Sequence, residues 1–76
     1  MMNFSDALEN LKLGYKVSRS GWNGKGMWIQ LKKPNGYFGT EEMTLPYIFM
    51  KTVTDDTVPW LASQTDILAD DWDVVD

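Results

Sequence analysis

A chain of 76 residues with 43% hydrophobic residues is long enough for one small domain, spanning residues 1–76, and too apolar for a disordered tail. It contains no cysteine and no histidine, which excludes disulfides, thiolate nucleophiles and ordinary zinc sites. Its net charge of -4 argues against binding of long nucleic acids, which requires broad neutralisation of phosphates.

A core of this size stabilises a chain by only about 3–5 kcal/mol, so we expect self-association to add stability. No apolar run approaches the roughly 20 residues of a membrane span, so we expect no membrane partner and a location in the cytoplasm. The charges are divided: residues 12–33 hold six of the seven basic residues and no acid, whereas residues 55–76 hold seven acids and no base. The basic half can hold a small anion, or the two halves attract one another within the fold or between subunits.

Residues 3–13 have the spacing of an amphipathic helix. Its apolar face is formed by Phe4, Ala7, Leu8 and Leu11. Asn3 is expected to cap this helix and Gly14 to end it. Two alternating segments, residues 15–19 and 27–33, predict strands on either side of a glycine-rich loop.

The sequence Pro-Asn-Gly at residues 34–36 predicts a chain reversal into residues 37 and 38. Residues 39–46 have no clear period and are predicted to form a loop. Residues 47–52 are apolar and strand-like, and the two aspartates at residues 55 and 56 mark a turn after them.

From Ser63 the pattern changes again. Ser63 and Asp66 have the spacing of a capping box, which predicts a helix of about two turns ending near Ala69. Residues 71–75 then predict a final strand. We therefore expect an α+β fold in which a small, mostly antiparallel sheet is joined by an N-terminal helix and a short C-terminal helix.

Catalytic chemistry has few candidates in this chain. Without His and Cys, proton transfer or nucleophilic attack would fall to Asp, Glu, Lys, Ser, Thr or Tyr. Asp70, Asp71 and Asp73 offer oxygen ligands but lack the glycine and glutamate of a calcium loop, and neither nucleotide fingerprint is present. We expect no enzyme activity, no catalytic residue, no metal and no cofactor.

Trp22 stands out because it lies in a loop where small polar residues are usual. A loop tryptophan either closes the edge of the core or offers a flat face to a ligand, and Arg19 and Lys25 add positive charge beside it. Trp28 and Trp72 fit strand patterns and are expected to pack, whereas Trp60 allows either interpretation.

Three segments carry a resemblance to a known family: "NFSDALENLKLGYKV" (residues 3–17), "RSGWNGKGMWI" (19–29) and "VPWLASQTDILADDWDVV" (58–75). They resemble the second family of phage Thoeris anti-defence proteins. This resemblance implies a small α+β protein that forms homotetramers and acts as a sponge in the cytoplasm of the infected bacterium. Such a protein sequesters glycocyclic ADP-ribose, a cyclic ADP-ribose-type signal, without cleaving it, so the Thoeris effector is not activated. Some members also capture cyclic oligonucleotides at separate sites.

The resemblance also implies a divided ligand site. Trp22 would stack on the base, Asp66 would contact a ribose hydroxyl, and Arg19 is a candidate phosphate partner or a structural residue. The full expected set of ligand-binding residues is Arg19, Trp22, Asn23, Gly24, Ser63, Gln64, Thr65 and Asp66.

The sequence departs from the family pattern in its middle, where relatives are expected to have a longer insertion before the third strand. It also has Asp56 in place of the glycine of the Asp-Gly turn that is expected before residues 58–60. The alternative to a signal sponge is a structural or protein-interaction module that assembles with itself or binds a host protein.

Overall fold

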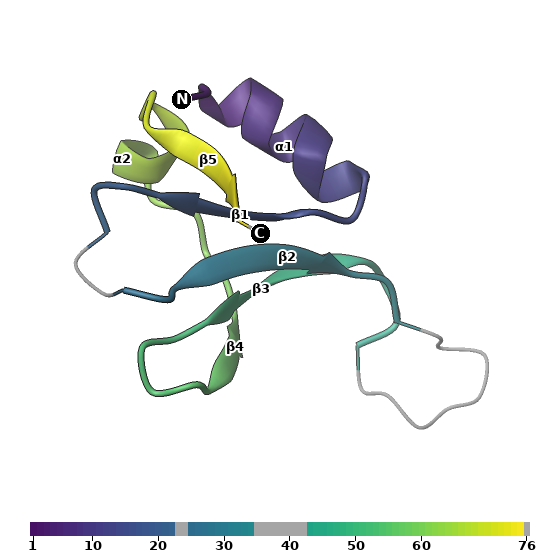
Figure 1. Ribbon diagram of the computed structural model, residues 1–76. Helices are drawn as coiled ribbons and strands as arrows, with labels where there is room; N and C mark the ends of the chain where they lie inside the picture. Colours follow the sequence, from purple (N-terminus) through teal and green to yellow (C-terminus); the bar gives the residue numbers. More distant parts are fainter. Residues whose placement is uncertain (23–24, 35–42, 76) are drawn as a thin grey trace.

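The computed structural model describes residues 1–22, 25–34 and 43–75 (Figure 1). Its elements in chain order are α1 (Phe4–Lys12), β1 (Lys16–Arg19), β2 (Trp28–Lys32), β3 (Tyr47–Lys51), β4 (Thr57–Pro59), α2 (Gln64–Ile67) and β5 (Trp72–Val75). The strands form one antiparallel sheet in the order β4-β3-β2-β1-β5. The predicted α+β class is therefore confirmed.

Helix α1 has the predicted boundaries because both ends are capped. At its start, Oδ1 of Asn3 accepts a hydrogen bond from the backbone N–H of Asp6 at 2.9 Å. At its end, Gly14 adopts a φ of +94°, a backbone conformation that suits glycine. The N–H groups of Gly14 and Tyr15 then return to the carbonyls of Leu11 and Asn10, each at 3.0 Å, which forms a Schellman motif.

The core lies between α1 and one face of the sheet (Figure 1). Fully buried side chains come from both layers: Ala7, Leu11, Val17, Ile29 and Trp72. The register explains this face, because Val17 of β1 lies opposite Ile29 of β2, and Ile29 lies opposite Met50 of β3. Helix α1 thus covers the side of the sheet that carries the apolar half of each alternating strand.

Three of the four tryptophans belong to one aromatic cluster. Trp72 is fully buried, and its ring centroid lies 5.3 Å from that of Trp22 and 6.1 Å from that of Trp60. Phe4 of α1 completes the cluster, 5.4 Å from Trp72 and 6.1 Å from Trp60. The packing role predicted for Trp72 is confirmed, and Trp60 also packs against the core.

Trp28 precedes the buried Ile29 in β2, so it lies on the opposite face of the sheet. No helix of the described residues covers this face (Figure 1). Its ring meets Phe49 of β3 edge-on, with centroids 5.8 Å apart, and Nζ of Lys16 lies 4.4 Å from the Trp28 ring centroid. This second face is therefore aromatic at its centre and flanked by a lysine.

Two predictions for the C-terminal half need correction. Strand β4 was not expected: it has three residues and ends in proline, which is tolerated only because β4 is an edge strand. Helix α2 has one turn and not two. The carbonyl of Asp66, which a longer helix would use for residue 70, instead accepts from Nε1 of Trp72 at 2.9 Å and from the N–H of Ala69 at 3.4 Å.

The predicted turn after β3 is confirmed. Asp55 adopts a φ of +67°, and the N–H of Asp55 bonds the carbonyl of Thr52 at 3.0 Å. Strand β2 ends at residue 32 and pairs antiparallel with β3, which begins at residue 47. The predicted reversal into residues 37 and 38 lies outside the described residues. Among the described helices, none has the length and apolar character needed to cross a membrane.

Replacing Leu11 by Ala tests the position of the core. Leu11 is fully buried, so we expect the free energy of unfolding to fall by about 2–5 kcal/mol, as measured by urea denaturation. Leu13→Ala is the matched control, because Leu13 is 73% exposed and its truncation should change the unfolding free energy by less than about 0.5 kcal/mol. Equal losses in the two variants would contradict this core.

Candidate functional site

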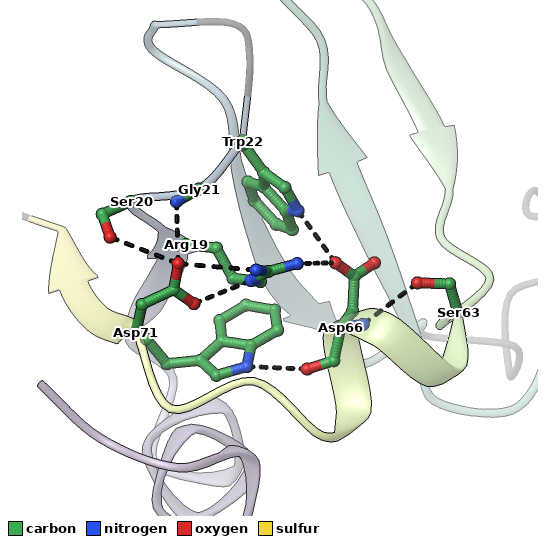
Figure 2. A network of polar contacts seen from close by, with 8 residues as sticks. Arg19, Ser20, Gly21, Trp22, Ser63, Asp66 and Asp71 are labelled. Atoms are coloured by element: carbon green, nitrogen blue, oxygen red, sulfur yellow. Dashed lines mark hydrogen bonds and ion pairs between the residues drawn. The ribbon is translucent and has the colours of Figure 1, made fainter.

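Arg19, the last residue of β1, is held between two aspartates from the C-terminal part of the chain (Figure 2). Its Nε lies 2.7 Å from Oδ1 of Asp71, and its Nη2 lies 3.5 Å from Oδ2 of the same residue. Its Nη1 donates to Oδ1 of Asp66 at 2.7 Å. The three side chains are only 15%, 24% and 14% exposed, so solvent screens these ion pairs less than ordinary surface pairs. We call these three residues and the four that contact their carboxylates or cap α2, Ser20, Gly21, Trp22 and Ser63, the Arg19 network.

Asp71 also fixes the loop that follows β1. Its Oδ2 accepts hydrogen bonds from the backbone N–H of Gly21 at 2.8 Å and from the hydroxyl of Ser20 at 3.2 Å. A Cβ atom at Gly21 would lie 2.9 Å from this oxygen and 3.0 Å from Nη2 of Arg19. A larger residue at this position would therefore displace the ends of the Asp71 and Arg19 side chains from their present places.

Asp66 connects α2 to the same loop. Its backbone N–H donates to Oγ of Ser63 at 3.0 Å, so the predicted N-cap is confirmed. Its carboxylate oxygen Oδ1 accepts from both Arg19 and Nε1 of Trp22, the latter at 3.1 Å. Nε1 of Trp72 donates to its carbonyl at 2.9 Å. Asp66 is thus held through both its backbone and its side chain.

The indole of Trp22 has the first of the two roles that the sequence left open, closure of the edge of the core, whereas its role toward a ligand stays a prediction. It packs against the core, with its ring nearly perpendicular to that of Trp72 at 81°. The residue is nevertheless only partly buried. Trp22 therefore closes the edge of the core and borders the surface at the same point.

The network keeps its charges at neutral pH. Burial alone would raise the pKa of Asp66, but hydrogen bonds from Arg19, Trp22 and Ser63 together outweigh burial and lower that pKa below the ordinary value. The Arg19 hydrogen bond lowers the pKa of Asp71, assisted by the N–H of Gly21. Hydrogen bonds to Asp71 and Asp66 raise the pKa of Arg19 in turn. One cation and two anions leave this network with a net charge of about -1.

The structure brings together four of the predicted ligand-binding residues: Arg19, Trp22, Ser63 and Asp66 (Figure 2). Gln64 and Thr65 are exposed on α2, in the turn that carries Asp66. Asn23 and Gly24 lie outside the described residues.

Three residues of the network were not singled out as site residues from the sequence: Ser20, Gly21 and Asp71. Gly21 carries a local signal, because it stands between Arg19 and Trp22. Asp71 was considered only as part of an acidic run, and nothing local relates it to Arg19, 52 residues away. Among the described residues, no group of His, Cys, Asp or Glu side chains is arranged to hold a metal ion.

A separate open cavity of about 480 Å³ lies at the β3 and β4 edge of the sheet. It is lined mainly by Lys32, Tyr47, Phe49 and Pro59, and it shares no residue with the Arg19 network. The polar network and this apolar cavity are therefore two distinct features of the surface.

Fold and site define a small α+β protein with a five-stranded sheet. At one edge of this sheet, the Arg19 network joins the loop that carries Trp22 to the helical turn that carries Asp66. Residues 2–75 match the family model of the Thoeris anti-defense 2-like domain. The chain is also 43% identical over 84 residues to Thoeris anti-defense 2 of Bacillus phage SP01, an alignment that covers 97% of this chain and 94% of the relative. The chain belongs to the Thoeris anti-defense 2-like family, and the resemblance inferred from its motifs is confirmed.

Acid titration tests the network. The lowered pKa values of Asp66 and Asp71 stabilise the folded state above the ordinary Asp pKa of about 3.9, and this contribution is lost as the pH falls through their folded-state values. We expect Asp71→Asn to be less stable than the wild type at pH 7 and to lose less of its unfolding free energy between about pH 4 and pH 2. Urea denaturation over this pH range measures both effects. Asp70→Asn, a control at an exposed neighbour, should keep wild-type stability at pH 7, and an equal loss there would contradict a specific role for Asp71.

Proposed function

We propose that this chain is a phage anti-defence protein that binds and sequesters a cyclic ADP-ribose-type signal, glycocyclic ADP-ribose, without cleaving it. Sequestration in the cytoplasm of the infected bacterium keeps the Thoeris effector inactive. The observation that carries the proposal is family membership: the match to the Thoeris anti-defense 2-like domain covers residues 2–75. A relative named Thoeris anti-defense 2 is 43% identical over 84 residues.

The contact between Trp22 and Asp66 supports a nucleotide ligand at this place. The 3.1 Å hydrogen bond joins the glycine-rich loop to α2, so a partly exposed indole lies beside exposed polar side chains. Stacking of a base on an aromatic ring contributes about 1–3 kcal/mol. Hydrogen bonds from Ser63, Gln64 and Thr65 would each add about 0.5–1.5 kcal/mol. A few such contacts reach micromolar affinity or better only when the site is already ordered.

The charge of the network bears on how the ligand is oriented. Arg19 already faces two carboxylates, so a phosphate placed on it would meet an excess of negative charge. Its structural role therefore has more support than its role as a phosphate partner. Lys25 is exposed in the same loop and is the better cation for the phosphates, with the base on Trp22.

Self-association completes the proposal. The sheet face that carries Trp28 and Phe49 is not covered by any helix of the described residues, and a second copy that covers it would add apolar burial to a small core. We further propose that the protein is a homotetramer, as its family resemblance implies. The same face favours a second candidate function, a protein-interaction module that assembles with itself or binds a host protein.

Calorimetric titration with the isomers of glycocyclic ADP-ribose tests the ligand directly. We expect binding heat from at least one isomer at micromolar protein, because stacking and several hydrogen bonds act together. The nucleotide should be recovered intact after heat denaturation of the complex. Absence of heat with every isomer would contradict the ligand, and a cleaved product would contradict sequestration.

Trp22→Ala separates the two candidate functions. A signal sponge should keep its oligomeric state and bind the nucleotide about 5–150-fold more weakly, which corresponds to the loss of one stacking contact. Light scattering measures the assembly, and a thermal melt checks that the variant folds. An interaction module that uses the face of Trp28 and Phe49 predicts a different result: neither the wild type nor Trp22→Ala binds nucleotide.

A further inference from the structure

The orientation of Trp22 is set by a residue that the resemblance assigned to the ligand. We propose that Asp66 is a positioning residue: its carboxylate fixes the indole of Trp22 for stacking and does not itself contact the nucleotide. Arg19 and Asp71 act through Asp66 by holding that carboxylate in place. The inference rests on the proposed function, because it specifies how the stacking surface of that site is built.

The first support is that one oxygen atom serves two donors. Oδ1 of Asp66 accepts from Nη1 of Arg19 at 2.7 Å and from Nε1 of Trp22 at 3.1 Å, as Figure 2 shows. A ribose hydroxyl that approached this oxygen would compete with both. The side chain as a whole is also only 14% exposed.

The second support is that Asp66 has little freedom to follow a ligand. Its backbone N–H is bonded to the hydroxyl of Ser63, and its carbonyl accepts from the indole N–H of Trp72. Trp72 is itself fully buried in the core. The backbone of Asp66 is therefore fixed against the core, and its carboxylate is a fixed acceptor for the indole N–H of Trp22.

The third support concerns the loop that carries Trp22. The carboxylate of Asp71 accepts from the backbone N–H of Gly21 at 2.8 Å and also pairs with Arg19. One carboxylate therefore holds both Gly21, which precedes Trp22, and Arg19, which bonds Asp66. The backbone and the ring of Trp22 are in this way held by the same network. The side chain that stacks and the side chain that aligns it come from opposite ends of the chain.

Fixing the ring before the ligand arrives affects the two rate constants differently. An ordered stacking surface costs no ordering free energy on binding, and differences of this kind between related complexes are found mostly in the dissociation rate. Loss of the Asp66 carboxylate should therefore speed dissociation by about tenfold or more, while association changes by less than about threefold.

The first measurement uses the ligand-free protein. In a two-dimensional ¹H–¹⁵N spectrum, the indole N–H of Trp22 is assigned as the signal that disappears in Trp22→Phe. Asp66→Ala should shift this signal and increase its hydrogen exchange by about tenfold or more, because the indole loses its acceptor. Asp66→Asn retains a neutral acceptor and should give an intermediate result. An unchanged signal in both variants overturns the proposal.

The second measurement is a double-mutant cycle on the dissociation rate of glycocyclic ADP-ribose. If Asp66 acts through Trp22, Asp66→Ala accelerates dissociation in the wild type and has less than about a twofold effect in the Trp22→Phe background. If Asp66 contacts the nucleotide, the acceleration is the same in both backgrounds, and the proposal is overturned. Asp70→Ala, at an exposed neighbour, is the control and should leave both measurements unchanged.

Failure of the function and failure of the inference give different results. A wild-type protein that binds no isomer overturns the proposed function, whatever the spectrum shows. The indole signal still reports on the hold of Asp66 over Trp22, because it is measured without ligand. If Asp66→Ala fails to fold, Asp66→Asn carries both measurements.

Discussion

The ion pairs of Arg19 join three parts of the chain that are far apart in sequence: the end of β1, the single turn of α2, and the residue before β5. This contact matters because the chain leaves β4 at one edge of the sheet and must reach β5 at the other edge. The segment between these strands has only one helical turn of its own, so its position depends on what holds it. Arg19 holds it through Asp66 and Asp71, while Trp60 and Trp72 pack beneath it against Phe4. Removal of either carboxylate would leave the partly buried cation with an incomplete shell of acceptors.

The uneven charge of the sequence is explained in part by this network. Residues 12–33 hold most of the basic side chains, whereas the charged side chains of residues 55–76 are all acidic. The structure pairs these two segments through Arg19. One of the two interpretations left open by the sequence, attraction between the halves within the fold, is therefore confirmed for this residue. The other, a small anion held by the basic half, stays a prediction that depends on residues outside the network.

Local patterns predicted α1 and four of the strands because their signals are local. The cap at Asn3, the glycine at residue 14 and the alternation around Val17 and Ile29 each act within a few residues. The errors arose where a distant partner decides the outcome. Helix α2 stops after one turn because Trp72 occupies the carbonyl of Asp66, and β4 exists because β3 offers it an edge. For the same reason Asp71 could not be assigned to the site: its importance comes from Arg19 and Gly21, about fifty residues earlier.

A protein that sequesters a signal must release it slowly, and slow release requires an ordered site. A 76-residue chain buries little apolar surface that could order a loop. The five fully buried side chains of the described residues all lie between α1 and the sheet. The hydrogen bonds and ion pairs of the Arg19 network lie outside that core and fix the position of Trp22, whose ring also packs against Trp72. In the proposed complex, the excess negative charge of the network would favour the flat base on the indole and would turn the phosphates away from Asp66 and Asp71. Order at this edge of the sheet, and selectivity in the proposed complex, would therefore have one physical source, the guanidinium that two carboxylates share.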